Sequence, residues 1–155
     1  MSKASRQGNL AETAFLHRAT ELGFSVSQPF GNCEPYDFIV DNGLKRWRVQ
    51  VKSTRAQCSP NRYLVNVGHR PKAAEGLPPT SVAYLDSEID FLAVYILAER
   101  TWYIVPIAGL AGRVRLRFFA GELARSGPNG IFHEAWHLLG RRKVDLLAHR
   151  HENLS

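Results

Sequence analysis

An Asn-Gly pair, Asn42-Gly43, constrains the fold of this chain more than any other feature of its sequence. It separates two β-rich runs, residues 35–41 and 46–53. Both residue types tolerate the positive φ of a type I′ turn, so the pair predicts a tight hairpin of two antiparallel strands. We expect the rest of the chain to be arranged around this hairpin.

Side chains alternate between the two faces of a strand, which gives the hairpin one polar and one apolar face. The polar members of the second strand share one face: Arg46, Arg48, Gln50 and Lys52. We expect Asp37, on the first strand, to point toward Gln50 and Lys52. Carboxylate and amide oxygens are ligands of hard cations, and an adjacent ammonium can hold a phosphate and favour ionisation of an attacking water. This convergence predicts metal-dependent phosphodiester hydrolysis.

The pattern Pro35-x-Asp37 followed by Gln50-x-Lys52 resembles the PD-(D/E)XK nuclease superfamily, in which glutamine sometimes occupies the second acidic position. Glu12, in the run 8–15, resembles the acidic residue that the superfamily carries on a helix before the hairpin. Within the superfamily the chain is most similar to the small homing endonucleases of group I introns. Residues 87–95 and 102–106 resemble the aromatic strand pair of those proteins.

The resemblance implies an α/β, restriction-endonuclease-like core with a mixed central sheet of about five strands, flanked by the first and the C-terminal helix. It implies a DNA endonuclease of homing, restriction or junction-resolving type that uses Mg2+, with Mn2+ as a substitute. The implied catalytic residues are Glu12, Asp37, Gln50 and Lys52, and the implied metal ligands are Asp37, Gln50, the Val51 carbonyl and Glu12. Because cleavage of both strands suits two symmetry-related sites, we expect a homodimer or homotetramer. Gln50 in place of a carboxylate leaves a catalytically inactive DNA-binding module open as an alternative.

A formal net charge of +6 and a pI near 9.7 favour a polyanionic partner. Double-stranded or branched DNA is the first candidate and an acidic membrane surface the second, although charge alone decides little. In the strand expected over 114–118, arginines alternate with apolar residues, which suits a phosphate track and equally a solvated edge strand. The candidate DNA contacts are Arg48, Arg55, Arg62, Arg70, Lys72, Arg115 and Arg117.

The chain of 155 residues, of which 45% are hydrophobic, is long enough for one core. We expect a single domain over 1–155, with a nuclease core over about 8–107 and a C-terminal strand and helix over 113–147. Cys33 and Cys58 lack the spacing of a disulfide framework, which favours a reducing compartment. No run has the length of a signal peptide or a transmembrane span, so we expect a cytoplasmic protein without a membrane partner.

Local patterns predict the remaining elements. Asn9 is the expected N-cap of a helix over 9–22, whose apolar face includes Leu10 and Phe15. The expected strands are 24–29, 62–67, 89–98 and 101–107, with a helical turn near 107–112. Residues 68–87 are expected to form a long loop that either contacts DNA or is a mobile surface loop.

A second motif, His133-Glu134-x-x-His137, lies in a helix expected over 131–147. On a helix the two histidines would share one face, as a zinc site requires. Lys143 stands at the third ligand position of the longer zinc motif and cannot bind the metal, which leaves His149, His151 or Glu152 as substitutes. A zinc hydrolase is therefore a remote alternative, beside the simpler interpretation of a helix that packs on the sheet.

Overall fold

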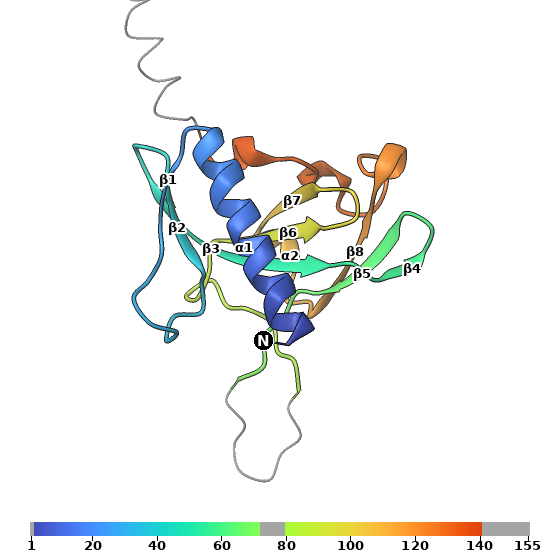
Figure 1. Ribbon diagram of the computed structural model, residues 1–155, viewed down its shortest axis with the longest axis horizontal. Coiled ribbons are helices and arrows are strands. Elements are labelled where there is room, and N and C mark those ends of the chain that lie inside the picture. Colours follow the sequence, from blue (N-terminus) through green and yellow to red (C-terminus); the bar gives the residue numbers. More distant parts are fainter. Residues whose placement is uncertain (1, 72–79, 141–155) are drawn as a thin grey trace, which may run out of the picture.

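The computed structural model describes residues 2–71 and 80–140. A helix covers one face of a central sheet, and a smaller sheet covers the other face (Figure 1). The elements of these residues are α1 (Lys3–Glu21), β1 (Ser25–Ser27), β2 (Phe38–Asp41), β3 (Arg46–Thr54), β4 (Gln57–Ser59), β5 (Arg62–Asn66), β6 (Phe91–Ile96), β7 (Thr101–Pro106), α2 (Ile107–Leu110), β8 (Arg115–Phe119) and 3-10 turns at Gly121–Leu123, Gly130–Phe132 and Trp136–Leu139.

Within the described residues the central sheet has five strands in the order β1-β2-β3-β6-β7. Its strand pairs are antiparallel except for β3 and β6, which are parallel. The predicted α/β fold with a mixed sheet of about five strands is therefore confirmed. The predicted antiparallel hairpin is β2 and β3, with Phe38 opposite Val49.

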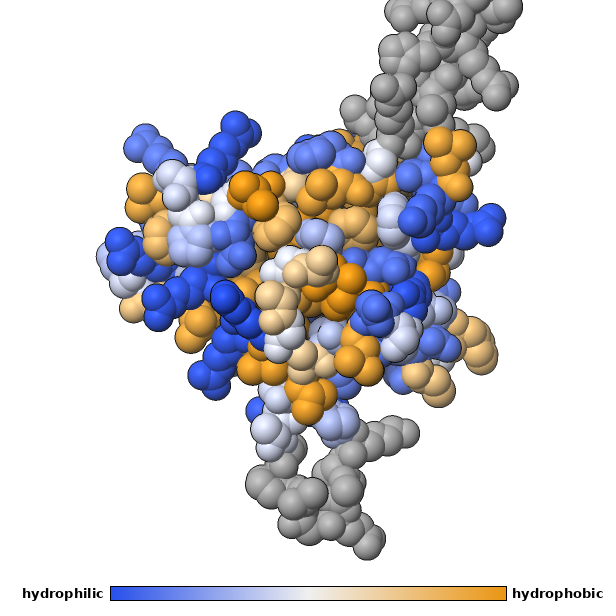
Figure 2. Space-filling view, turned by 180° about the vertical axis from the view of Figure 1, so that it is seen from behind, coloured by the Kyte–Doolittle hydropathy of each residue, from blue (hydrophilic) through white to orange (hydrophobic). Residues whose placement is uncertain are grey.

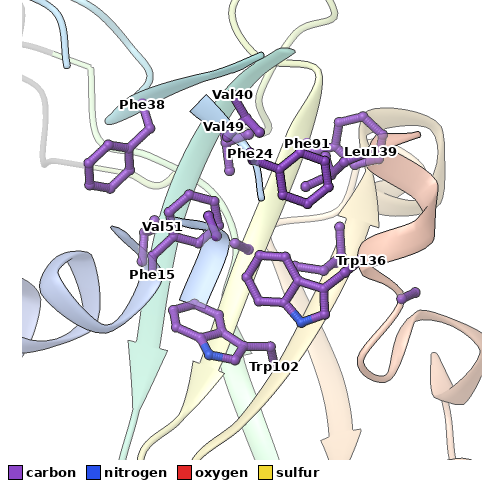
Figure 3. Close-up of a cluster of buried hydrophobic side chains, with 14 of the residues drawn as sticks. Phe15, Phe24, Phe38, Val40, Val49, Val51, Phe91, Trp102, Trp136 and Leu139 are labelled. Atoms are coloured by element: carbon purple, nitrogen blue, oxygen red, sulfur yellow. The ribbon is translucent and has the colours of Figure 1, made fainter. Parts of the chain in front are cut away.

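The helix α1 packs on the central sheet through Ala11, Phe15 and Ala19. The Phe15 ring stacks on Phe38 at 5.2 Å between centroids and meets Trp102 edge-on at 5.6 Å (Figure 3). Burial of a phenylalanine contributes about 2 kcal/mol to the free energy of unfolding. Because a rotation of the helix about its axis would expose Phe15, this contact fixes that rotation. Leu10, expected on the apolar face, is 48% exposed, and Ala11 takes its place.

The predicted N-cap at Asn9 was wrong. The helix begins at Lys3 because the Ser2 Oγ accepts a hydrogen bond from the Ser5 amide at 3.1 Å. Gln7 then ties this added part of the helix to β3, since its Nε2 donates to the Ser53 carbonyl at 3.3 Å and to the Ser53 Oγ at 3.2 Å. Glu12 consequently lies in the middle of the helix, beyond reach of the dipole at its N-terminus.

A second sheet, β4-β5-β8, covers the other face of the central sheet within the described part of the chain. Tyr63, Val65, Leu116 and Phe118 form its inner face and pack with β6. The sequence predicts the first and the C-terminal helix as the elements that flank the central sheet, and does not predict this second sheet. The sequence predicted the strands at 62–67 and 114–118 but not their pairing, which joins segments about fifty residues apart.

The turn between β2 and β3 differs from the predicted type I′ turn, because Gly43 has a positive φ (93°) and Asn42 does not. The buried Asn42 side chain organises this loop instead. Its Oδ1 accepts from the Leu44 and Lys45 amides at 2.8 and 2.7 Å, and its Nδ2 donates to the Leu139 carbonyl at 2.7 Å. The hairpin is thus held to the C-terminal segment as well as to its own strands.

The helix predicted over 131–147 does not form in its described part, residues 131–140, where 3-10 turns occur instead. Glu134 has a φ of 48°, which breaks a right-handed helix. Its carboxylate accepts from the Trp102 amide at 3.0 Å and from the Trp136 Nε1 at 2.7 Å, and these bonds hold the residue in that conformation. Residues 141–147 lie outside the described residues. None of the described helices is long and apolar enough to cross a membrane.

Candidate active site

The carboxylate of Asp37, the residue before β2, is fixed against the neighbouring strand β3. The Asp37 amide donates to the Val49 carbonyl at 3.0 Å, and its Oδ2 accepts from the Val51 amide at 2.8 Å. The Gln50 Nε2 lies 3.3 Å from the Val51 carbonyl oxygen. Asp37 and Gln50 therefore both contact Val51 of β3, Asp37 through the amide of that residue and Gln50 through its carbonyl.

Glu12 reaches this point from α1 and lines the same cleft as Asp37 and Gln50. Burial, reinforced by the negative charge of Asp37, raises the pKa of Glu12. Burial also raises the pKa of Asp37, although the Val51 amide and the Lys52 ammonium partly offset this effect. Two carboxylates whose pKa values are both raised therefore share one cleft of about 570 Å3.

Lys52 lies on β3, two residues after Gln50, and is half-buried. Burial lowers the pKa of Lys52, and the charge of Asp37 partly counteracts this. Its Nζ lies 5.6 Å from the centroid of the Tyr84 ring. Raised carboxylate pKa values beside a lowered lysine pKa are typical of functional sites, where ionisable groups are buried although their burial does not stabilise the fold.

The sequence did not reveal the other wall of the cleft, which His69 and Tyr84 form. The centroids of their rings lie 4.7 Å apart. They are brought together by an antiparallel β-bridge, in which His69 and Val82 exchange backbone hydrogen bonds, inside the segment 68–87 that is predicted to be a loop. Burial, together with the charges of Asp37 and Glu88, raises the pKa of Tyr84. Its hydroxyl therefore stays protonated near neutral pH and can donate a hydrogen bond.

Arg48, expected to contact DNA, binds other parts of the protein instead. Its guanidinium donates to both Asp90 oxygens, at 3.1 and 2.9 Å, and to the backbone carbonyls of Asp86 and Ser87. The Asp90 Oδ2 also accepts from the Arg48 amide at 2.8 Å. Arg48 thus joins β3 to the segment that leads into β6 and has few donors left for a phosphate.

Other predicted DNA contacts lie on the outer face of the second sheet, which exposes Arg62, Arg115 and Arg117. Hydrophilic side chains gather over this side of the molecule in Figure 2, on the left. Arg70 and Arg115 line a surface groove of about 740 Å3. Arg55 lies in a different groove, beside α1 and the end of β6. Lys72 lies outside the described residues.

The zinc motif does not form the geometry that it requires. The His133 Nε2 lies 2.6 Å from the Thr101 Oγ1, while Glu134 binds the backbone and side chains described above, and His137 is exposed on a 3-10 turn. Across residues 2–71 and 80–140, no group of three or more His, Cys, Asp or Glu side chains is placed to hold a metal. Lys143 and the substitute ligands His149, His151 and Glu152 lie outside the described residues.

Comparisons with known proteins bear on the fold and the family. The fold is similar to the solved structure of a bacterial homing endonuclease, I-Ssp6803I, with a TM-score of 0.74 and 23% sequence identity over 89% of this chain and 93% of that chain. No curated protein matches the sequence. A family model described as PD-(D/E)XK endonuclease matches residues 2–138, which include the helix, the hairpin and both sheets. The chain therefore belongs to the PD-(D/E)XK endonuclease family, as the spacing of Asp37, Gln50 and Lys52 predicted.

Proposed function

We propose that this chain is a Mg2+-dependent endodeoxyribonuclease that hydrolyses phosphodiester bonds in double-stranded or branched DNA. The observation that carries the proposal is the cleft that Glu12, Asp37 and Gln50 line together, with Lys52 close enough to Asp37 to act on its charge. Glu12 and Asp37 would together hold a divalent cation, whose charge would offset the negative charge that each carboxylate brings to the cleft. The membership of the chain in an endonuclease family supports the same assignment.

The donor set fits a hard divalent cation because each proposed ligand carries an oxygen, and a turn of the Gln50 amide would bring its oxygen to the side of the Val51 carbonyl where its Nε2 now lies. Asp37 and Glu12 supply carboxylates, Gln50 supplies a neutral amide oxygen and Val51 a backbone carbonyl. Mn2+ accepts the same ligands and is expected to substitute for Mg2+. When bound, the cation supplies positive charge that polarises the scissile phosphate and makes water easier to ionise.

The residues of the chain hold the substrate and the attacking water in position. The ammonium of Lys52 contacts a non-bridging phosphate oxygen and stabilises the negative charge that develops there. Its partial burial strengthens this contact, because the charge is less screened by water. The hydroxyl of Tyr84, which remains protonated, is a hydrogen-bond donor on the other wall of the cleft.

The DNA backbone is expected to follow the exposed arginines of the second sheet. Arg62, Arg115 and Arg117 lie on strands β5 and β8, and the groove with Arg70 continues this basic surface. Arg55 and Lys72 remain predicted contacts, whereas Arg48 is left out because its donors are taken. Each phosphate contact releases counterions, so binding should weaken steeply with salt.

The second candidate function is a DNA-binding module without catalytic activity, and Gln50 is the observation that favours it. A glutamine in place of a carboxylate removes one negative charge from the donor set and weakens its attraction for a cation. An active enzyme therefore depends on Glu12 or on the substrate phosphate to supply the missing charge. Both candidates share the fold and the basic surface.

We further propose a single-domain protein that acts in the cytoplasm as a homodimer or homotetramer, because two symmetry-related sites can cut both strands of a duplex. The similarity to a solved bacterial homing endonuclease supports a homing type among the possible roles. Restriction and junction resolution use the same chemistry and are distinguished by the substrate that is cut.

The proposal is tested by incubating the protein with supercoiled plasmid and with a branched DNA junction in Mg2+, Mn2+ or EDTA. The parent protein is compared with Lys52→Ala and with a control, Lys45→Ala, whose lysine lies near Trp47 at the other end of the hairpin. Metal-dependent cleavage that Lys52→Ala removes and Lys45→Ala retains supports the nuclease. Salt-sensitive binding of both DNA forms and of genomic DNA, without cleavage of any of them, supports the inactive module.

A further inference from the structure

Phe30 lies fully in solvent at the rim of the catalytic cleft, with a relative exposure of 105%. Single exposed apolar residues are common on protein surfaces, so the exposure alone indicates nothing. Its position is informative. The flanking residues Pro29 and Gly31 both line the cleft that contains Asp37, whereas Phe30 between them projects into solvent.

The backbone on both sides of Phe30 restricts how this residue can move. Pro29 has a fixed φ, which limits the conformations of the chain before the ring. Gly31 has a φ of 76°, a conformation that other residues rarely adopt, although a Cβ at this position would meet no atom within 4 Å. The glycine is therefore required by the turn of the chain rather than by close packing. Together they limit the conformations open to the loop that carries the exposed ring.

We infer that Phe30 stacks on or between bases of the DNA that enters the cleft. This inference rests on the proposed function. A nucleic acid is the partner that fits, because the adjacent cleft is suited to a phosphodiester and the chain carries a net charge of +6. Every base has a flat apolar face on which an aromatic ring can stack, and an inserted phenylalanine partly unstacks neighbouring bases and kinks the duplex.

Stacking by Phe30 would affect which DNA is cut. Pyrimidine–purine steps and branch points are easier to open than stiff duplex, so insertion costs less there. A kink beside the cleft also changes the path of the backbone that passes Asp37 and Lys52. Phe30 is thus a positioning and specificity residue, separate from the groups that contact the reacting phosphate.

The test compares the parent protein with Phe30→Ala, Phe30→Trp and a control, Leu44→Ala. Leu44 is 80% exposed and lies in the β2–β3 turn, at the opposite end of the hairpin from Asp37. Binding to plasmid fragments is measured with Ca2+ in place of Mg2+, and unstacked thymines are mapped by permanganate oxidation followed by sequencing. We expect permanganate-reactive thymines with the parent, Phe30→Trp and Leu44→Ala proteins but not with Phe30→Ala, whose affinity falls roughly 5- to 100-fold.

Binding without reactive thymines, or Phe30→Ala with unchanged affinity and reactivity, would overturn the inference while leaving the nuclease proposal intact. A parent protein that neither binds nor cuts DNA would overturn both. Sedimentation of each variant without DNA tests the other use of an exposed ring. A change of oligomeric state in Phe30→Ala would show that the ring packs on a second copy and would also overturn the inference.

Discussion

Replacing Asp37 by asparagine should stabilise the metal-free protein and remove its response to Mg2+. An asparagine Oδ1 can still accept the hydrogen bond from the Val51 amide, so the local structure is kept. In the parent, burial raises the pKa of Asp37 above that of the unfolded chain. The folded state therefore binds its proton more tightly, and this contribution to stability is lost as the pH rises through the raised pKa. At pH 7.5 the parent carries the cost of a buried charge, and the variant does not.

Addition of Mg2+ should make the parent more stable than Asp37→Asn. Above the dissociation constant of a single site, each tenfold increase in free Mg2+ adds about 1.4 kcal/mol to the free energy of unfolding. Unfolding entropies near 2.1 cal/mol/K per residue, over the 155 residues of the chain, convert this to a rise of about 4 °C in the midpoint for each tenfold increase. The parent should show this slope, and Asp37→Asn should give a flat line.

Thermal unfolding is measured by calorimetry in EDTA and at a series of Mg2+ concentrations, at pH 7.5 and at pH 5. The matched control is Glu34→Gln, which removes another carboxylate that lines the same cleft but is not a proposed ligand. Glu34→Gln should keep the parental slope. A Mg2+ slope that survives in Asp37→Asn, or a lower midpoint of this variant in EDTA, would refute the assignment of Asp37 as a metal ligand with a raised pKa.

Three further outcomes test other parts of the molecule. Lys52→Met should lower the rate of DNA cleavage by roughly 10²- to 10⁴-fold in single-turnover kinetics, with little change in DNA affinity in filter binding. A loss of affinity without a loss of rate would contradict the role of Lys52 at the reacting phosphate. Arg48→Gln should lower the free energy of unfolding by about 2 kcal/mol in a denaturant titration, because it breaks charged hydrogen bonds to Asp90. Arg117→Gln should leave stability unchanged and should reduce the salt dependence of DNA binding by about one counterion, measured as affinity across salt concentrations. A loss of stability in Arg117→Gln, or a reduced salt dependence in Arg48→Gln, would contradict these roles. His137→Ala should leave both zinc content and cleavage unchanged, and metal analysis that finds one zinc per parent chain, lost in this variant, would restore the zinc hydrolase.

The chemistry-bearing residues of β3 could be predicted because strand geometry is local. The alternation of side chains places Gln50 and Lys52 on one face whatever the rest of the chain does, and Asp37 follows from the pairing of two strands that adjoin in sequence. Glu12 was found through the family pattern and lies close enough to Asp37 for that carboxylate to raise the pKa of Glu12. Local signals also located the strands at β5–β8, with boundaries shifted by a few residues.

The errors arose where distant contacts outweighed local preferences. Residues 131–140 have a helical pattern, but the hydrogen bonds that the Glu134 carboxylate accepts from Trp102 and Trp136 prevent the helix. Asn42 favours a type I′ turn in isolation, yet its side chain bonds to the Leu139 carbonyl, 97 residues away. The distant partners, Trp102 for Glu134 and Leu139 for Asn42, cannot be recognised from the residues next to these positions.

The sequence by itself determined the hairpin, because it follows from a turn preference and a short-range period, whereas the central mixed sheet and the candidate ligands were implied by the resemblance to the nuclease superfamily. The tertiary structure decided how deeply those residues are buried and which charged groups lie next to them. It places Arg48 in hydrogen-bond contact with Asp90, adds His69 and Tyr84 to the lining of the cleft, and pairs β5 with β8 in a second sheet. The physical reason is that burial and charge proximity depend on contacts between distant segments, and these contacts set the pKa values on which the proposed chemistry rests.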